Sequence, residues 1–95
     1  MKGKHDYKAG AYYVVNNPAY NITTVFMIEE VVRDDPRPDL INCVILATTD
    51  RLRGEYMCFN SDVDSGFIKE IPSTDLPLYV GLPYTFPALK EAINV

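Results

Sequence analysis

Apolar residues occur along the chain in short runs separated by turn-forming residues, a pattern typical of strands joined by turns. The first run, Ala11 to Val15, is rich in aromatic and β-branched residues and stops at Asn16-Asn17-Pro18. Tyr and Val fit the pleated surface of a sheet, whereas Pro cannot donate to its ladder. We therefore predict a strand at residues 11–15 that ends in a turn.

Residues 22–32 are the longest strand candidate. Alternation puts three apolar residues on one face of such a strand: Ile22, Phe26 and Ile28. The other face is apolar as well, at Val25, Met27 and Val31. A strand that is apolar on both faces is often bent, so we predict a bulge at Glu29-Glu30 that switches the buried face. A helix over 24–32 is the alternative, and the β-branched residues there disfavour it.

The middle of the chain has the pattern of a hairpin. Leu40 to Ala47 is nearly continuously apolar, which indicates a central strand buried on both faces. A polar loop at residues 33–39 precedes it, and the two prolines of this loop exclude both helix and ladder. After a turn at 48–52, residues 53–60 return as the next strand, and a short strand at 67–71 follows a further turn.

Four of the seven prolines fall in the last part of the chain. They predict an extended segment that lies across the sheet, in which Leu78 to Val80 adds an edge strand. Thr85 is expected to cap a final helix at 86–94. Pro87 then sits in the first turn, where its missing N–H costs nothing, and Leu89 belongs to the apolar face.

Five short strands and little helix make the fold class mainly β. We expect a small SH3-like antiparallel barrel or a strongly bent five-stranded sheet with a short C-terminal helix. The order of elements is similar to that of SH3-like barrels, although no family motif carries the likeness. Residues 1–10 are expected to be a flexible lead-in, and residues 11–95 a single domain that ends in the proline-punctuated segment 72–95.

The distribution of charged residues bears on whether the partner is a nucleic acid or a protein. The formal net charge is −4, and the region 29–64 contains nine acidic residues against four arginines. Duplex-binding domains are normally basic, because neutralising phosphates supplies most of their affinity. The acidic middle therefore makes nucleic acid an unlikely partner.

The two cysteines test the register of the predicted hairpin. If the hairpin is symmetric about Asp50-Arg51, the numbers of paired residues sum to 101, and Cys43 faces Cys58. The chain opens without an apolar signal segment, so we expect a cytoplasmic protein with two free, buried thiols. A disulfide between the two is the alternative. With His5 as the only histidine, a zinc site is not expected.

No group of residues supports catalysis. Neither cysteine has a histidine nearby in sequence to act as a base, and there is no phosphate-binding glycine-rich loop. Glu29 and Glu30 are adjacent in a strand, so their carboxylates should point to opposite faces. The segment 60–66 lacks the glycine and the distal glutamate of a calcium loop, which leaves a polar turn. We expect neither an enzyme nor a cofactor or metal.

The surplus of tyrosine points to binding. Tyrosine is enriched in the residues that dominate protein interfaces, and loops carry binding more often than strands. The alternative is that these rings only cover the ends of the fold. The candidate partner-binding residues come from the aromatic positions and the acidic loop: Tyr12, Tyr20, Asp34, Asp35, Tyr79, Tyr84 and Phe86.

The first functional hypothesis is a non-catalytic interaction domain, of the accessory or phage type, that binds and modulates a larger host protein. The alternative is a structural component that assembles into a homo-oligomer through a sheet edge or the proline-rich segment. A weak nucleic-acid binder is the third hypothesis.

Overall fold

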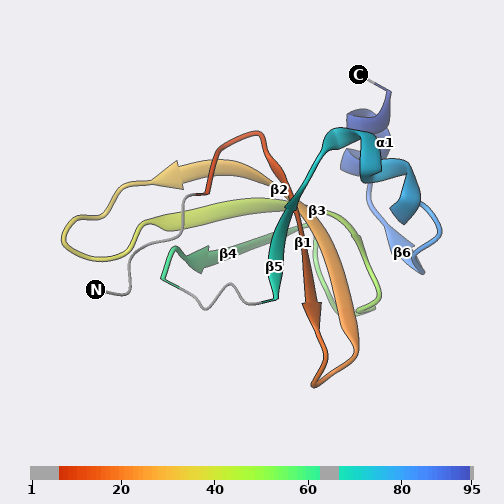
Figure 1. The fold of residues 1–95 in the computed structure, drawn as a ribbon, viewed down its shortest axis with the longest axis horizontal. Helices are drawn as coiled ribbons and strands as arrows, with labels where there is room; N and C mark the ends of the chain where they lie inside the picture. The colour runs from red at the N-terminus through yellow and green to blue at the C-terminus, as the bar shows by residue number, and fades with distance from the viewer. Residues whose placement is uncertain (1–6, 63–66, 95) are drawn as a thin grey trace.

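The computed structural model describes residues 7–62 and 67–94, and its centre is an antiparallel sheet (Figure 1). The order of strands across the sheet is β4-β3-β2-β1-β5, and β6 pairs with β3 beside this path. The strands are β1 (Tyr12–Asn17), β2 (Ile22–Val32), β3 (Leu40–Thr48), β4 (Tyr56–Asn60), β5 (Ile68–Ile71) and β6 (Tyr84–Thr85). A 3-10 helix, η1 (Ser73–Tyr79), and an α-helix, α1 (Pro87–Ile93), complete the described elements.

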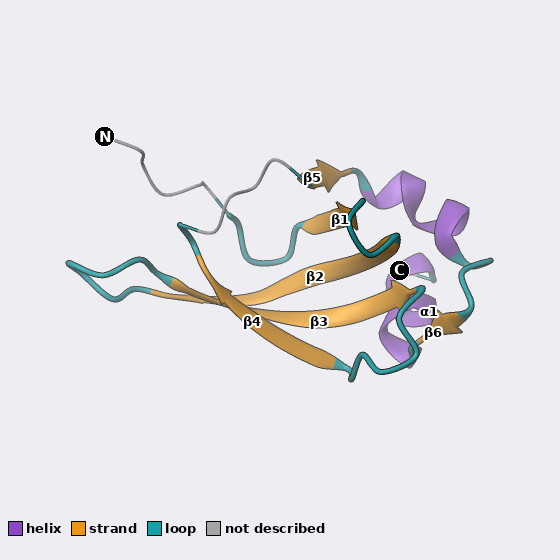
Figure 2. Ribbon diagram, turned by 90° about the horizontal axis from the view of Figure 1, so that it is seen from below, coloured by secondary structure: helices purple, strands orange, loops and turns teal. Residues whose placement is uncertain are grey.

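The sheet is strongly curved but unclosed. Strands β4 and β5 form its two margins and do not pair with each other over the described residues (Figure 2). The mainly β fold, the antiparallel pairing and the short C-terminal helix are thus confirmed. Closure into a barrel is not observed, and the sheet has two edges.

Strand β2 contains the predicted bulge. Ile28 pairs with Cys43, and the next pair is Glu30 with Asn42, so the register shifts at Glu29. The extra residue places Glu30 on the exposed face and returns Val31 to the buried face of Ile28. A second shift lies between Val25 and Phe26. The prediction of a long, bulged strand is confirmed, and the helical alternative is wrong.

Both faces of the sheet are buried by different parts of the chain. On one face, Phe26 and Ile45 pack with Tyr7, whose ring contacts that of Phe59 edge to face at 5.2 Å between centroids. The opposite face, which includes the fully buried Val25, packs against the two helices. The side chains in this second core come from three elements of the sheet and both helices: Val14, Val25, Leu46, Ala47, Leu76 and Leu89. Each core thus requires a segment from outside the sheet.

The register of the β3–β4 hairpin differs by one residue from the predicted one. Cys43 pairs with Met57, and Cys58 pairs with Asn42. Strand β4 begins only at Tyr56, opposite Val44. The end of β3, Ala47 and Thr48, pairs with β6 instead. The predicted register would have placed Asn60 opposite Ile41 in the core, so burial of the apolar side chains selects the observed one.

The C-terminal segment corrects two predictions. Leu78 to Val80 is not an edge strand, because Leu78 belongs to η1, and the edge strand is β6. Thr85 does not cap α1 but lies in β6, and the capping position is Phe86, with no side-chain hydrogen bond. Pro87 occupies the first turn, as predicted. The residue before a proline is held extended, so the helix begins one position later than we expected.

Parts of two predicted segments, the lead-in and one turn, lie outside the described residues. Residues 1–6 belong to the lead-in and 63–66 to the turn predicted at 61–66. In the described part of the lead-in, Tyr7 is buried, and the Gly10 N–H donates to the Ile28 carbonyl at 2.7 Å. Ser61 is also buried, and its hydroxyl accepts a hydrogen bond from the Asp39 N–H at 3.0 Å.

Candidate functional site

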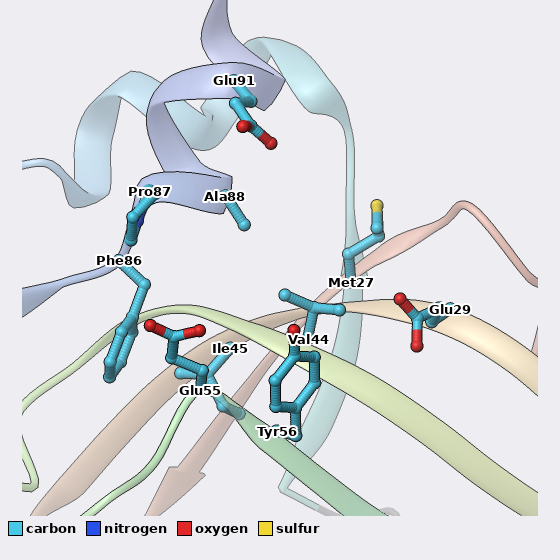
Figure 3. A pocket seen from close by; sticks show the side chains of 10 residues that line it. All are labelled: Met27, Glu29, Val44, Ile45, Glu55, Tyr56, Phe86, Pro87, Ala88 and Glu91. Atoms are coloured by element: carbon cyan, nitrogen blue, oxygen red, sulfur yellow. The ribbon is translucent and has the colours of Figure 1, made fainter.

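An open pocket of about 300 Å³ lies between α1 and the sheet, and we call it the acidic groove (Figure 3). It is lined by residues from β2, β3, the start of β4 and the first turns of α1. These residues are Met27, Glu29, Val44, Ile45, Glu55, Tyr56, Phe86, Pro87, Ala88 and Glu91. The floor is therefore apolar, whereas carboxylates stand around it.

The groove results from a change of partner along one side of β3. The Ile45 N–H donates to the Glu55 carbonyl at 2.8 Å, immediately before β4. The next carbonyl on β3, that of Leu46, accepts from the Phe86 N–H at 2.9 Å. Strand β4 and the segment that enters α1 thus diverge from adjacent points of β3. The space between them opens onto the sheet.

Three carboxylates share this groove without a counter-charge. Glu29, Glu55 and Glu91 are exposed, and the described lining contains no Lys, Arg or His. Among residues 7–62 and 67–94, no ion pair joins any of the three to a basic side chain. Like charges gathered around a concave surface create a negative potential that attracts cations.

The apolar part of the groove includes two aromatic rings. Tyr56 is 68% exposed although it lies in a strand, and Figure 3 shows its hydroxyl pointing toward the side of the groove formed by α1. Phe86 is half-buried and Met27 lies across the floor from it. A cation over a tyrosine face is attracted by the ring quadrupole, and methylene groups pack on apolar side chains. The groove fits a long cationic side chain.

The structure does not bring the seven predicted binding residues together. Tyr20, 74% exposed, lies in the turn between β1 and β2, whereas Asp34 and Asp35 lie in the loop at the other end of β2 (Figure 1). Tyr12 and Tyr79 pack against the second core. The two others are Tyr84, which is 41% exposed in β6, and Phe86, the only one of the seven that lines the acidic groove.

The acidic loop at 33–39 carries its own counter-charges. The Asp39 carboxylate is buried and accepts from the exposed Arg33 guanidinium at 3.0 Å. Asp34 accepts from Arg37 at 3.2 Å. These pairs reduce the charge that the loop presents, so this loop is a weaker attractor for a basic partner than the groove.

Sequence reasoning missed most of the groove residues. Glu55 and Glu91 belong to different elements, and no spacing in the sequence signals that they share a pocket. The prediction for Glu29 and Glu30 assumed regular alternation, which the bulge interrupts between Ile28 and Glu30. The bulge leaves both exposed, with Glu29 beside Asn42 in a shallow pocket and Glu30 accepting from the Asn42 amide at 3.4 Å.

The two cysteines occupy different environments. Both are free, but only Cys43 is buried, whereas Cys58 is exposed, so the prediction of two buried thiols is wrong for Cys58. Burial, and secondarily the charge of Cys58, raises the pKa of the Cys43 thiol to about 12. A thiol with so high a pKa is a poor nucleophile at neutral pH.

Within the described residues, no group of three His, Cys, Asp or Glu side chains is placed to hold a metal ion. Among the described residues, neither of the two helices, η1 and α1, is long and apolar enough to cross a membrane. Comparison with protein-family models, with curated proteins and with solved structures found no match.

Proposed function

We propose that this protein is a non-catalytic interaction domain that binds a basic segment of a larger host protein in the acidic groove. The observation that carries the proposal is the set of three carboxylates without described counter-charges around an apolar floor. Exposed like charges gathered around a concave surface create a negative potential that attracts a cation. A cationic side chain from another protein would supply it.

The arrangement suits lysine or arginine in particular. The aliphatic stem of such a side chain would pack on Met27 and Phe86, and its charged group would lie among the carboxylates. Tyr56 would add a cation–π contact at the exposed end of the groove. Because the carboxylates come from β2, the approach to β4, and α1, the cation would be held by parts of the fold that are far apart in sequence.

The likeness of the fold to SH3-like barrels is part of the same proposal. We propose that the strongly bent sheet acts as an SH3-like scaffold, with the groove beside one of its margins. Fold by itself does not determine function, so the proposal rests on the chemistry of the groove. Nucleic acid is not favoured as the partner, because its phosphates would meet three carboxylates.

The proposal is tested by capturing partners with matched baits. Wild-type protein and the double variant Glu55→Gln, Glu91→Gln are immobilised and exposed to extract from the native host, and bound proteins are quantified by mass spectrometry. We expect one stoichiometric partner on the wild type and at least a tenfold loss on the double variant. Rising salt should weaken the wild-type capture.

The matched control is Glu70→Gln in β5, which removes an exposed carboxylate that does not line the groove. It should retain the partner fully. Equal capture by the wild type and the double variant would refute binding through the groove, and failure of the wild type to capture any stoichiometric partner would refute the interaction domain itself.

A further inference from the structure

The two edges of the sheet differ in how they are protected against pairing with another strand. Strand β5 carries the exposed charges Lys69 and Glu70 and is followed by Pro72, all features that blunt an edge. Strand β4, with the sequence Tyr-Met-Cys-Phe-Asn, carries no charge. Among the described strands it pairs with β3 alone and lies at the margin of the sheet (Figure 2). Over residues 7–62 and 67–94, the edge of β4 is open for a further strand.

The hydrogen-bonding pattern shows which backbone groups this edge presents. The Glu55 carbonyl accepts from Ile45, and the Ser61 N–H donates to Asp39, so the odd-numbered residues in and beside β4 bond to β3. Partners alternate along an antiparallel strand. The N–H and C=O groups of Tyr56, Cys58 and Asn60 therefore point away from β3, to the open edge.

From this pattern we propose that β4 pairs in antiparallel fashion with β4 of a second copy of the chain, with Cys58 on the twofold axis. In this register Cys58 faces Cys58 of the second copy, and Tyr56 faces Asn60 in both directions. Each of the three pairs closes two backbone hydrogen bonds, six in all. A shift of the axis to Met57 or Phe59 loses one of the three pairs. The isologous pairing joins two sheets into one.

The residues that would pair at this edge, Tyr56 to Asn60, add no charge repulsion of their own. Each copy has a formal net charge of −4, so two copies repel over most of their surfaces. Strand β4 combines an uncharged pairing segment with a sheet edge, although Glu55 directly precedes it. The proposal predicts that salt strengthens the dimer, because salt screens the general repulsion. Binding of a basic segment in the acidic groove shows the opposite dependence on salt.

Sedimentation of the full chain from micromolar to millimolar concentration measures the association. The average mass should rise from 10.7 kDa toward twice that value, and the rise should occur at lower concentration when ionic strength is increased. Oxidation with diamide, which takes up the two hydrogens of two thiols, should then link the copies. Opposed residues in a hydrogen-bonded pair have Cα atoms about 5.5 Å apart, within the range of a disulfide.

Two variants separate this edge from other contacts. Cys58→Pro removes an N–H that points away from β3, so the β3–β4 ladder is retained while the central pair is lost. Cys58→Lys places like charges at the axis. Both should stay monomeric, whereas Cys58→Ser should dimerise without the covalent link and Lys69→Ser, on the other edge, should behave as wild type. Circular dichroism checks that each variant is folded.

A wild-type chain that stays monomeric at millimolar concentration in high salt would overturn the proposal. So would a dimer that folded Cys58→Pro and Cys58→Lys still form, since that dimer would use another surface. The result is independent of the acidic groove: the Glu55→Gln, Glu91→Gln variant should dimerise at least as well as the wild type, whether or not the groove binds a partner.

Discussion

At the scale of single residues, the buried thiol of Cys43 makes stability depend on alkaline pH. Its pKa is 9.0 in the absence of burial and about 12 in the folded chain. Between these values the unfolded state releases the proton and the folded state retains it. Stability contributed by this group is therefore fully present below pH 9 and is lost as pH rises toward 12.

We expect the free energy of unfolding to fall with pH in this window, by at most about 1.4 kcal/mol per pH unit from this thiol. Cys43→Ala should lower stability at neutral pH but flatten the slope between pH 9 and 12. Urea unfolding at a series of pH values measures both. Cys58→Ala is the control: it removes an exposed thiol whose charge is only the secondary cause of the raised pKa, so most of the slope should remain. A slope in Cys43→Ala equal to that of the wild type would contradict the assignment.

Single residues also show where sequence reasoning stops. The pattern of apolar positions located Tyr13, Phe26 and Ile45 in strands, because alternation and β-branching are local properties. The neighbours of Glu91 were not predictable, since its groove partners come from β2 and the β3–β4 region. Residues that are distant in sequence and become neighbours only in the folded chain show no pattern in the sequence that predicts their contact.

At the scale of elements, the β3–β4 hairpin explains why its predicted register was wrong by one. The prediction assumed a tight turn at Asp50-Arg51, which would fix the register. Instead, residues 49–55 form a wide loop, in which Asp50 accepts from the Leu52 N–H through its side chain at 3.0 Å. A loop of this length does not determine the pairing, so the inward packing of Met57 and Phe59 does.

The bulge in β2 was predictable because a strand apolar on both faces that then meets two glutamates must change its exposed face. Helix α1 was predictable from Pro87, which fits the first turn. The 3-10 helix was not, because prolines also suit extended edges. The sequence pattern did not show that two short helices would cover one face of the sheet.

The contact of α1 with the sheet is the element-scale interaction most open to test. Leu89 is 3% exposed and packs in the second core with Leu76 and Val25. Leu89→Ala should destabilise the fold by about 2–5 kcal/mol, the range for buried leucines. Urea denaturation measures the loss.

The matched control is Leu78→Ala in η1, where the side chain is 75% exposed. Its effect should stay within about 0.5 kcal/mol. Similar, small effects of both substitutions would show that α1 does not depend on the second core and would remove the support for a groove fixed between α1 and the sheet.

At the scale of the whole molecule, the two proposed surfaces use charge in opposite ways. The acidic groove concentrates negative charge without described counter-ions, while the β4 edge is free of charge. Tyr56 belongs to both, since it lines the groove and presents outward backbone groups at the start of β4. A partner in the groove and a second copy at the edge would therefore lie close to each other.

The central claim is that a basic partner binds in the groove, and the most direct test is an NMR map of the captured partner's basic segment bound to the ¹⁵N-labelled chain. Our account predicts the largest amide shifts at Glu29, Glu55, Tyr56 and Glu91, and their loss in Glu55→Gln, Glu91→Gln. Shifts confined to Tyr20 and the loop at 33–39, with the groove unperturbed, would contradict it.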